Sequence, residues 1–267
     1  TNSGENDLGK ILNVHYTFSG IFLFGAPLLG KLIIDYWGYK GLFITSAAFF
    51  VVLLIFLNSM RFKSAEFEGS REENRFNLRE ITRIRNFILF FSAFFFRFLP
   101  LSMFSIYLPL FLKTQKGFSL TEIAIYFAIV DILVVILQIP AGILVDKYDK
   151  RIFIFLDGFT DVVFALICVF CMDKYLLIIG AVLSQLFNIP GGTALSIMTR
   201  NLFPKDKLKQ VISFSAVIKH FSFIIGPVLG GYFITNISYR PIFYLIIAGS
   251  LYYSFISLRF SDSELMR

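Results

Sequence analysis

The sequence predicts an all-α protein that crosses a membrane many times. Of its 267 residues, 57% are apolar and only 16% are charged, and the charged residues are clustered. Between the clusters lie apolar runs of roughly 20 residues, which is the length that an α-helix needs to cross a bilayer. Inside lipid each segment must satisfy its own backbone hydrogen bonds, so these runs are expected to be helices.

Eight such spans are predicted, with a polar stretch between the second and the third. They cover residues 8–36, 41–58, 87–113, 120–145, 151–172, 175–203, 208–235 and 241–260. This pattern divides the chain into a first pair of helices (1–60), a central loop (61–86) and a six-helix unit (87–267).

Local signals support the starts of three spans. Ser119 and Glu122 have the spacing of a capping box at the fourth span, so Glu122 is interpreted as a cap rather than a proton carrier. Asp206 can cap the seventh span, and Pro241 suits the first turn of the eighth.

The distribution of Lys and Arg predicts the orientation in the membrane. In the connections, basic residues on one side outnumber those on the other by about three to one. The basic side faces the cytoplasm, which places both ends of the chain and the central loop there, in a plasma (inner) membrane. Residues 77–86 are predicted to form a short basic amphipathic helix on the membrane surface, with a solvated linker as the alternative.

Several classes of function are disfavoured. The net charge of +7 does not indicate nucleic-acid binding, because the basic residues lie in the connections and form no continuous face. Cys168 and Cys171 have redox-type spacing but lie inside an apolar run, so they are interpreted as small membrane residues. No metal site, cofactor or enzyme motif is predicted.

The first two spans resemble the last two at a constant offset of 200 residues. The matched positions include Pro27 with Pro227 and Gly30 with Gly230. Because six helices separate the partners, the chain is expected to come from two six-helix halves in parallel repeat, which is one known plan of secondary transporters.

Residues 142–151, GILVDKYDKR, resemble the loop motif G-x-x-x-D-R/K-x-G-R/K-R/K of the major facilitator superfamily. The matching residues are Gly142, Asp146, Lys147, Lys150 and Arg151, whereas Asp149 stands where the motif has glycine. The G-P-x-x-G-G signature of helices five and eleven is matched by Gly226, Pro227, Gly230 and Gly231, and weakly by residues 25–31.

The resemblance implies that the chain supplies helices five to twelve of twelve, with helices one to four absent. The implied partners are a lipid bilayer, a small-molecule substrate and a coupling ion, with protons expected. In the efflux branch of the superfamily the signature on helix five is associated with antiport. Here the copy on helix five is the weaker one and the better copy is on helix eleven, so the support for efflux is only slight. The expected function is secondary active transport by alternating access, as antiport or symport, and the alternative is a membrane sensor of the same fold that has lost transport.

Ionisable residues within membrane spans are costly and are therefore candidates for function. Four of them are predicted to lie near the middle of the membrane from their positions along the helices, namely Arg97, Asp131, Asp161 and Lys219. His220 and Asn188 are further candidates, whereas Asp157 is expected near the interface and solvated. Helix breaks are predicted at the same depth, at Pro100, Pro190, Gly191 and Gly192.

Two arrangements follow as hypotheses. Arg97 and Asp131, on adjacent helices, are expected to form a coupled pair or to share the cavity, with a static structural pair as the alternative. The resemblance also implies that Asp146 holds a cytoplasmic gate against the start of the first helix, around residues 8–10, because a helix N-terminus stabilises a carboxylate.

Overall fold

The computed structural model describes residues 3–59, 87–203 and 207–259. Every regular element in this part of the chain is an α-helix, as predicted. Six helices within it are long and apolar enough to cross a bilayer by length and composition. The amphipathic helix predicted at 77–86 and the cap predicted at Asp206 lie outside the described residues.

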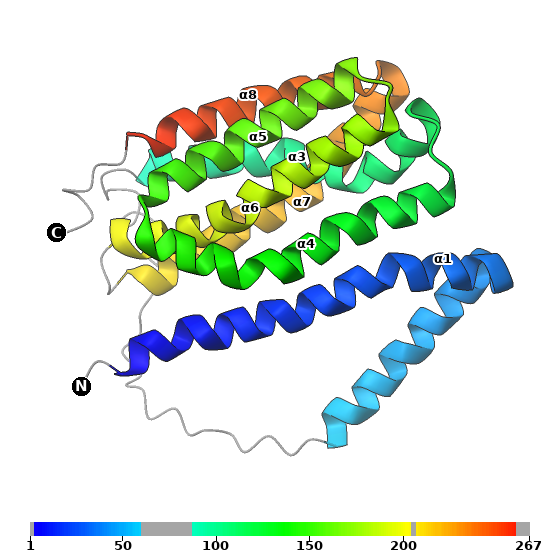
Figure 1. Ribbon diagram of the computed structural model, residues 1–267, viewed down its shortest axis with the longest axis horizontal. Coiled ribbons are helices and arrows are strands. Elements are labelled where there is room, and N and C mark those ends of the chain that lie inside the picture. The colour runs from blue at the N-terminus through cyan, green and yellow to red at the C-terminus, as the bar shows by residue number, and fades with distance from the viewer. Residues whose placement is uncertain (1–2, 60–86, 204–206, 260–267) are drawn as a thin grey trace.

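Helix α1 (Ser3–Ser59) has two limbs that meet at Gly38, and Figure 1 shows them diverging from this point. The break has φ 66° and ψ −174°, a conformation that glycine adopts without steric cost. The first two predicted spans, 8–36 and 41–58, fall on the two limbs. The eight predicted spans therefore correspond to seven helices in the described residues, with only a single-residue break between the first two spans.

The other six helices run along the bundle, each in the opposite direction to the one before it, and most of the connections between them are short (Figure 1). They are α3 (Phe87–Gln115), α4 (Leu120–Lys147), α5 (Lys150–Phe170), α6 (Lys174–Leu202), α7 (Leu208–Asn236) and α8 (Arg240–Ser257). The capping box of Ser119 and Glu122 is confirmed at α4, and Pro241 lies in the first turn of α8. Glu122 also pairs with Lys174 at 2.7 Å.

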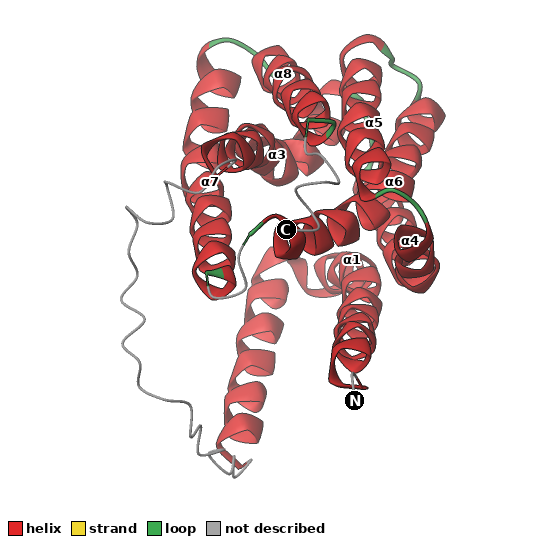
Figure 2. Ribbon diagram, turned by 90° about the vertical axis from the view of Figure 1, so that its left-hand side faces the viewer, coloured by secondary structure: helices red, strands yellow, loops and turns green. Residues whose placement is uncertain are grey.

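The helices pack in a defined order, which Figure 2 shows along the bundle. Helix α3 packs against α7 and α8, α5 packs against α6 and α8, and α4 packs against α6 and α1. The second limb of α1 extends away from the six-helix unit and leaves apolar side chains such as Phe43 and Phe49 exposed. Exposed apolar side chains are expected of helices that contact lipid or further membrane helices.

The core of the six-helix unit has two apolar clusters at opposite ends of the helices. One cluster contains Phe87, Ile154 and Phe203, near the starts of α3 and α5 and the end of α6. The other contains Leu112 and Leu177, near the end of α3 and the start of α6. Along α3, Arg97 lies after the residues of the first cluster and before those of the second. The acidic residues of α5 lie between the two clusters in the same way.

The glycine signature of α7 packs against α3. A side chain at Gly226 would lie 1.9 Å from Ser102 Oγ, so only glycine permits this approach. Ser102 Oγ donates a hydrogen bond to the Ser222 carbonyl at 2.8 Å, and Tyr107 donates to the Pro227 carbonyl at 2.9 Å. The hydrogen bonds and the close approach together fix α7 on α3.

Pro100 produces a second close approach, between α3 and α8. Proline removes the amide that would bind the carbonyl of Phe96. This carbonyl lies directly against Gly249, where an added Cβ would come within 2.0 Å of its oxygen. In α1, by contrast, an added Cβ at Gly30 would make only an ordinary contact of 3.9 Å with Leu42.

Candidate functional site

Arg97 is the centre of a buried polar cluster between the two apolar ends of the bundle. It is only 4% exposed and extends from α3 towards α5. Its Nη1 donates to Asp157 Oδ2 at 2.5 Å and its Nη2 donates to Asp157 Oδ1 at 2.7 Å. Two parallel bonds of this kind are the strongest geometry of an Arg–carboxylate pair.

A second carboxylate, Asp161, lies one turn further along α5 and is 6% exposed. Its Oδ2 is 3.2 Å from Arg97 Nη2, but this atom accepts no directed hydrogen bond from any residue that the structure describes. Its Oδ1 accepts a hydrogen bond from Ser184 at 2.9 Å. Asp161 is therefore held less completely than Asp157.

Helices α6 and α8 close the cluster. Asn188 of α6 donates to Asp157 Oδ1 at 3.2 Å. The ring of Tyr253 from α8 lies 4.3 Å from the Arg97 guanidinium carbon, and its buried hydroxyl has no hydrogen-bond partner among the described residues. Four helices thus contribute to one site, in which Asp161 Oδ2 and the Tyr253 hydroxyl have no hydrogen-bond partner within the described part of the chain.

The charges in this cluster do not balance. In the described part of the chain, Arg97 is the one cation that forms an ion pair with either carboxylate. A guanidinium is always charged, so two ionised carboxylates would leave one uncompensated negative charge in the membrane. Neutrality requires either a proton on one carboxylate or another cation.

The backbone of α6 comes close to Asp157 at Gly191. A Cβ at this position would lie 2.4 Å from Asp157 Cβ, whereas a Cβ at the neighbouring Gly192 would meet nothing within 4 Å. Helix α6 runs without interruption through 190–192, so the break predicted there does not form. The missing side chain of Gly191 makes room for the buried ion pair.

We expect Gly191→Ala to destabilise the protein strongly, because the methyl group must displace a carboxylate that is held by Arg97 and Asn188. Gly192→Ala is the matched control and should leave stability unchanged or raise it, since alanine favours a helix. Thermal unfolding of the purified protein in detergent measures both. Equal unfolding temperatures for the two variants would contradict this packing.

The predicted pair of Arg97 with Asp131 does not form. Asp131 is half-buried on α4 and makes no ion pair with a described residue, whereas α3 directs Arg97 towards α5. The expectation that Asp157 is solvated was also wrong, since this residue is 1% exposed. Arg97, Asp161 and Asn188 were predicted and are brought together, but Asp157, Ser184 and Tyr253 were missed.

One signal could have identified Asp157. Asp157 and Asp161 are four residues apart, so they lie on the same face of α5. Asp161 was predicted to lie at mid-membrane depth. A second carboxylate on the same face of the helix, Asp157, is therefore expected to share the environment of Asp161. The other two predicted candidates, Lys219 and His220, are exposed on α7 and do not join the cluster.

The loop motif at 142–151 joins α4 to α5. Asp149, which replaces the glycine of the motif, is the N-cap of α5 and accepts a hydrogen bond from the Arg151 amide at 2.9 Å. Its φ of −63° is available to any residue, so this turn needs no glycine. Hydrogen bonds from the Arg151 side chain hold the pKa of Asp149 below its usual value. Asp146 and Lys147 are exposed.

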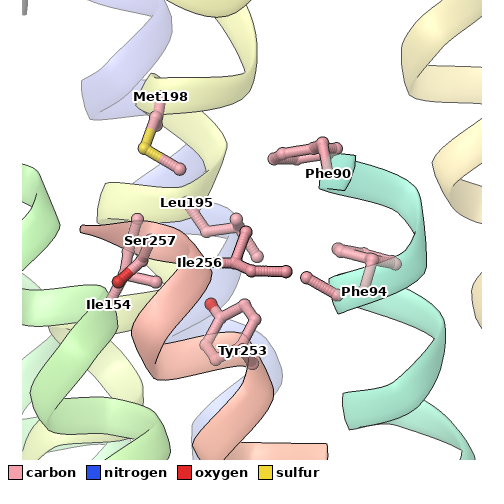
Figure 3. Close-up of a pocket in the computed structure, with 9 residues that line it drawn as sticks. Phe90, Phe94, Ile154, Leu195, Met198, Tyr253, Ile256 and Ser257 are labelled. Atoms are coloured by element: carbon pink, nitrogen blue, oxygen red, sulfur yellow. The ribbon is translucent and has the colours of Figure 1, made fainter. Parts of the chain in front are cut away.

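Tyr253 also lines a small apolar cavity, and Figure 3 shows the residues around it. Its volume of about 10 Å³ is room for at most one water. The walls include Phe90, Phe94 and Met198 (Figure 3), so this space is a packing defect and not a solute site. No group of three or more His, Cys, Asp or Glu that could hold a metal occurs among the described residues.

These features define an integral membrane protein, with apolar helices around a buried ionic centre. The family model of the Major Facilitator Superfamily matches residues 2–170 and 132–264. The chain therefore belongs to the Major Facilitator Superfamily, a family of membrane transporters.

The chain is also similar to the uncharacterized MFS-type transporter YfiS of Bacillus subtilis (strain 168). The two are 28% identical over 127 residues, which is 48% of this chain and 30% of that protein. The chain thus matches less than a third of the length of this relative.

Proposed function

We propose that this chain supplies helices five to twelve of a twelve-helix secondary transporter that couples solute movement to protons. Residues 1–60 would complete the first half, 61–86 would link the halves, and 87–267 would form the second half. Family membership supports the transporter class. The unequal charges of Arg97, Asp157 and Asp161 carry the proposal of proton coupling.

The burial of this cluster fits such a role. A proton on Asp161 would neutralise the site while the helices are packed as described. Tyr253 and the apolar clusters separate the site from water, so the proton can exchange only when the helices move. This dependence would link proton exchange to alternating access, in which one half rocks against the other. Asp131 and His220 remain proposed groups of the solute pathway.

A substrate-independent experiment tests this function. The transporter that contains this chain is reconstituted in liposomes filled with a mixture of sugars, amino acids, organic acids and amines, with a pH dye inside. An inward proton gradient should release at least one solute faster than in protein-free liposomes, with matching proton entry. Because efflux is slightly favoured, release is measured first. Uptake by symport is then measured with the same inward proton gradient and the solutes outside the liposomes.

The same assay distinguishes the rival function. A membrane sensor of this fold would bind a solute without moving it. If no solute crosses the membrane in either direction, and dissipating the proton gradient changes nothing, the sensor becomes the better account.

We also propose that Asp146 holds a cytoplasmic gate against the N-terminus of the first helix. Asp146 is exposed near the end of α4, and Figure 1 places this end of α4 at the same end of the bundle as the first turns of α1. Helices α1 and α4 pack together along the bundle. The side chains of the proposed partners, residues 8–10, lie outside those that the structure describes.

Replacing Asp146 with Asn should shift the transporter towards the inward-open state, because the exposed carboxylate contributes roughly 0.3–1 kcal/mol at a helix N-terminus. Electron paramagnetic resonance distances between spin labels at the cytoplasmic ends of α1 and α4 measure this shift. Lys147→Gln is the control, since it changes the neighbouring charge and leaves the carboxylate. Identical distance distributions in wild type and Asp146→Asn would remove the gate.

A further inference from the structure

Lys219 is a cation held at mid-membrane depth. It lies eleven residues after the first residue of α7, or about 16 Å along the helix. Its Nζ is 5.7 Å from the centroid of the Phe98 ring, and Phe98 lies eleven residues after the first residue of α3. Helices α3 and α7 run in the same direction in Figure 1, so the ammonium stays level with its own backbone and does not reach towards the interface.

The ammonium has no acidic partner among the described residues. Asp157 and Asp161 are both directed at Arg97, and Asp131 makes no ion pair. Lys219 is also exposed, although it lies well inside α7 and not near either end of this helix. A lone charge at this depth is costly in lipid, so it must meet water or an anion. The contact with Phe98 supplies only part of this compensation, since a cation–π pair of this kind is weak when exposed.

The surroundings limit the kind of anion. Phe98 and Ile218 are partly buried and pack on the apolar cluster at the end of the bundle where α3 begins. Lys219 therefore presents a single point charge beside an apolar wall. Phosphate groups are usually held by several donors or by the planar fork of arginine, which this position lacks. A carboxylate attached to an apolar body matches one ammonium beside an aromatic ring.

We propose that Lys219 and Phe98 bind the carboxylate of a small organic anion, the solute class of this transporter. This inference rests on the proposed function, because the solute must reach the middle of the membrane. Lys219 would neutralise the carboxylate, and the Phe98 ring would contact the apolar body. The solute would also supply the counter-charge that Lys219 lacks in the described structure.

Three probes of the same ring and nearly the same size test the charge requirement. Benzoate, benzyl alcohol and benzylamine are added separately, at equal concentration and neutral pH, to the purified transporter that contains this chain. Thermal unfolding is measured in detergent. Benzoate should raise the unfolding temperature, because a ligand stabilises the state that binds it, and the alcohol and the amine should not. A benzoate effect equal to that of benzyl alcohol would overturn the proposal.

Variants at Lys219 test the residue itself. In Lys219→Gln the affinity for benzoate should fall by about tenfold or more, since a hydrogen bond to a charged group is lost. Lys219→Arg should retain most of the benzoate effect, and Phe98→Leu should weaken it less than Lys219→Gln does. Undiminished benzoate binding by Lys219→Gln would contradict the proposal.

The remaining outcomes are also informative. If benzoate has no effect on the wild type and Lys219→Gln lowers stability without ligand, the counter-charge belongs to the protein and the proposal fails. The comparison of the three probes on the wild type decides the matter even if the variants do not fold. Binding requires no flux, so benzoate can still raise the unfolding temperature if the liposome assay shows no transport. Conversely, solute flux can occur even if benzoate does not bind. The two proposals can therefore fail separately.

Discussion

Replacing Arg97 with Met should abolish transport and lower the stability of the folded protein by about 3–5 kcal/mol, the usual cost of removing one partner from a buried ion pair. Two carboxylates that are 1% and 6% exposed would then lack their cation. Thermal unfolding in detergent and the yield of folded protein measure the loss. Arg200→Met is the control, because Arg200 is exposed near the end of α6.

A triple variant separates charge from size. Arg97→Met, Asp157→Asn and Asp161→Asn together remove every charge of the cluster, and neutral replacement of a buried ionic group often preserves stability. We expect the triple variant to recover most of the unfolding temperature and none of the proton-coupled flux. If Arg97→Met alone is as stable as wild type, the carboxylates are not held by this cation.

Asp161→Asn should remove proton coupling and leave the protein folded. The variant keeps the two short bonds of Arg97 with Asp157, and it removes the carboxylate that has no full partner. Solute should still move down its own gradient in the liposome assay, but proton entry should not accompany it. The unfolding temperature should equal or exceed that of wild type.

Asp157→Asn is the informative comparison with Asp161→Asn, since it neutralises the other aspartate of the cluster, one turn away on α5. It breaks the bidentate pair and should lower the unfolding temperature clearly. Asp131→Asn should leave proton coupling intact, because Asp131 forms no ion pair with Arg97. Proton entry at the wild-type ratio in Asp161→Asn would show that the coupling group lies elsewhere.

The sequence predicted the helices better than the contacts between them. Length and hydropathy located the spans, because a bilayer fixes how long an apolar helix must be. Only the first two predicted spans differ from the structure, where they are two limbs of α1 that meet at Gly38 without an intervening loop. The glycine signature at 226–231 was identified by resemblance, and the structure adds its partners, Ser102 and Tyr107.

The partner of Arg97 could not be predicted in the same way. Position along a helix gives depth, so Arg97 and Asp131 were expected to meet at the same level. Depth does not say which neighbour a side chain faces, and α3 packs mainly against α7 and α8 rather than α4. Asp157 was misjudged because it lies near the start of α5, where Arg97, Asn188 and Gly191 nevertheless enclose it.

We propose that a proton neutralises Asp161, the second carboxylate of the buried cluster. Infrared spectroscopy of the transporter in lipid, with carbon-13 in its aspartates, measures this state through the carbonyl stretch of a protonated carboxyl group. Neutralisation of Asp161 by a proton should give such a band at neutral pH in wild type and in Asp131→Asn, and the band should be lost in Asp161→Asn. A wild-type spectrum with only ionised carboxylates, or a band that survives in Asp161→Asn, would contradict it.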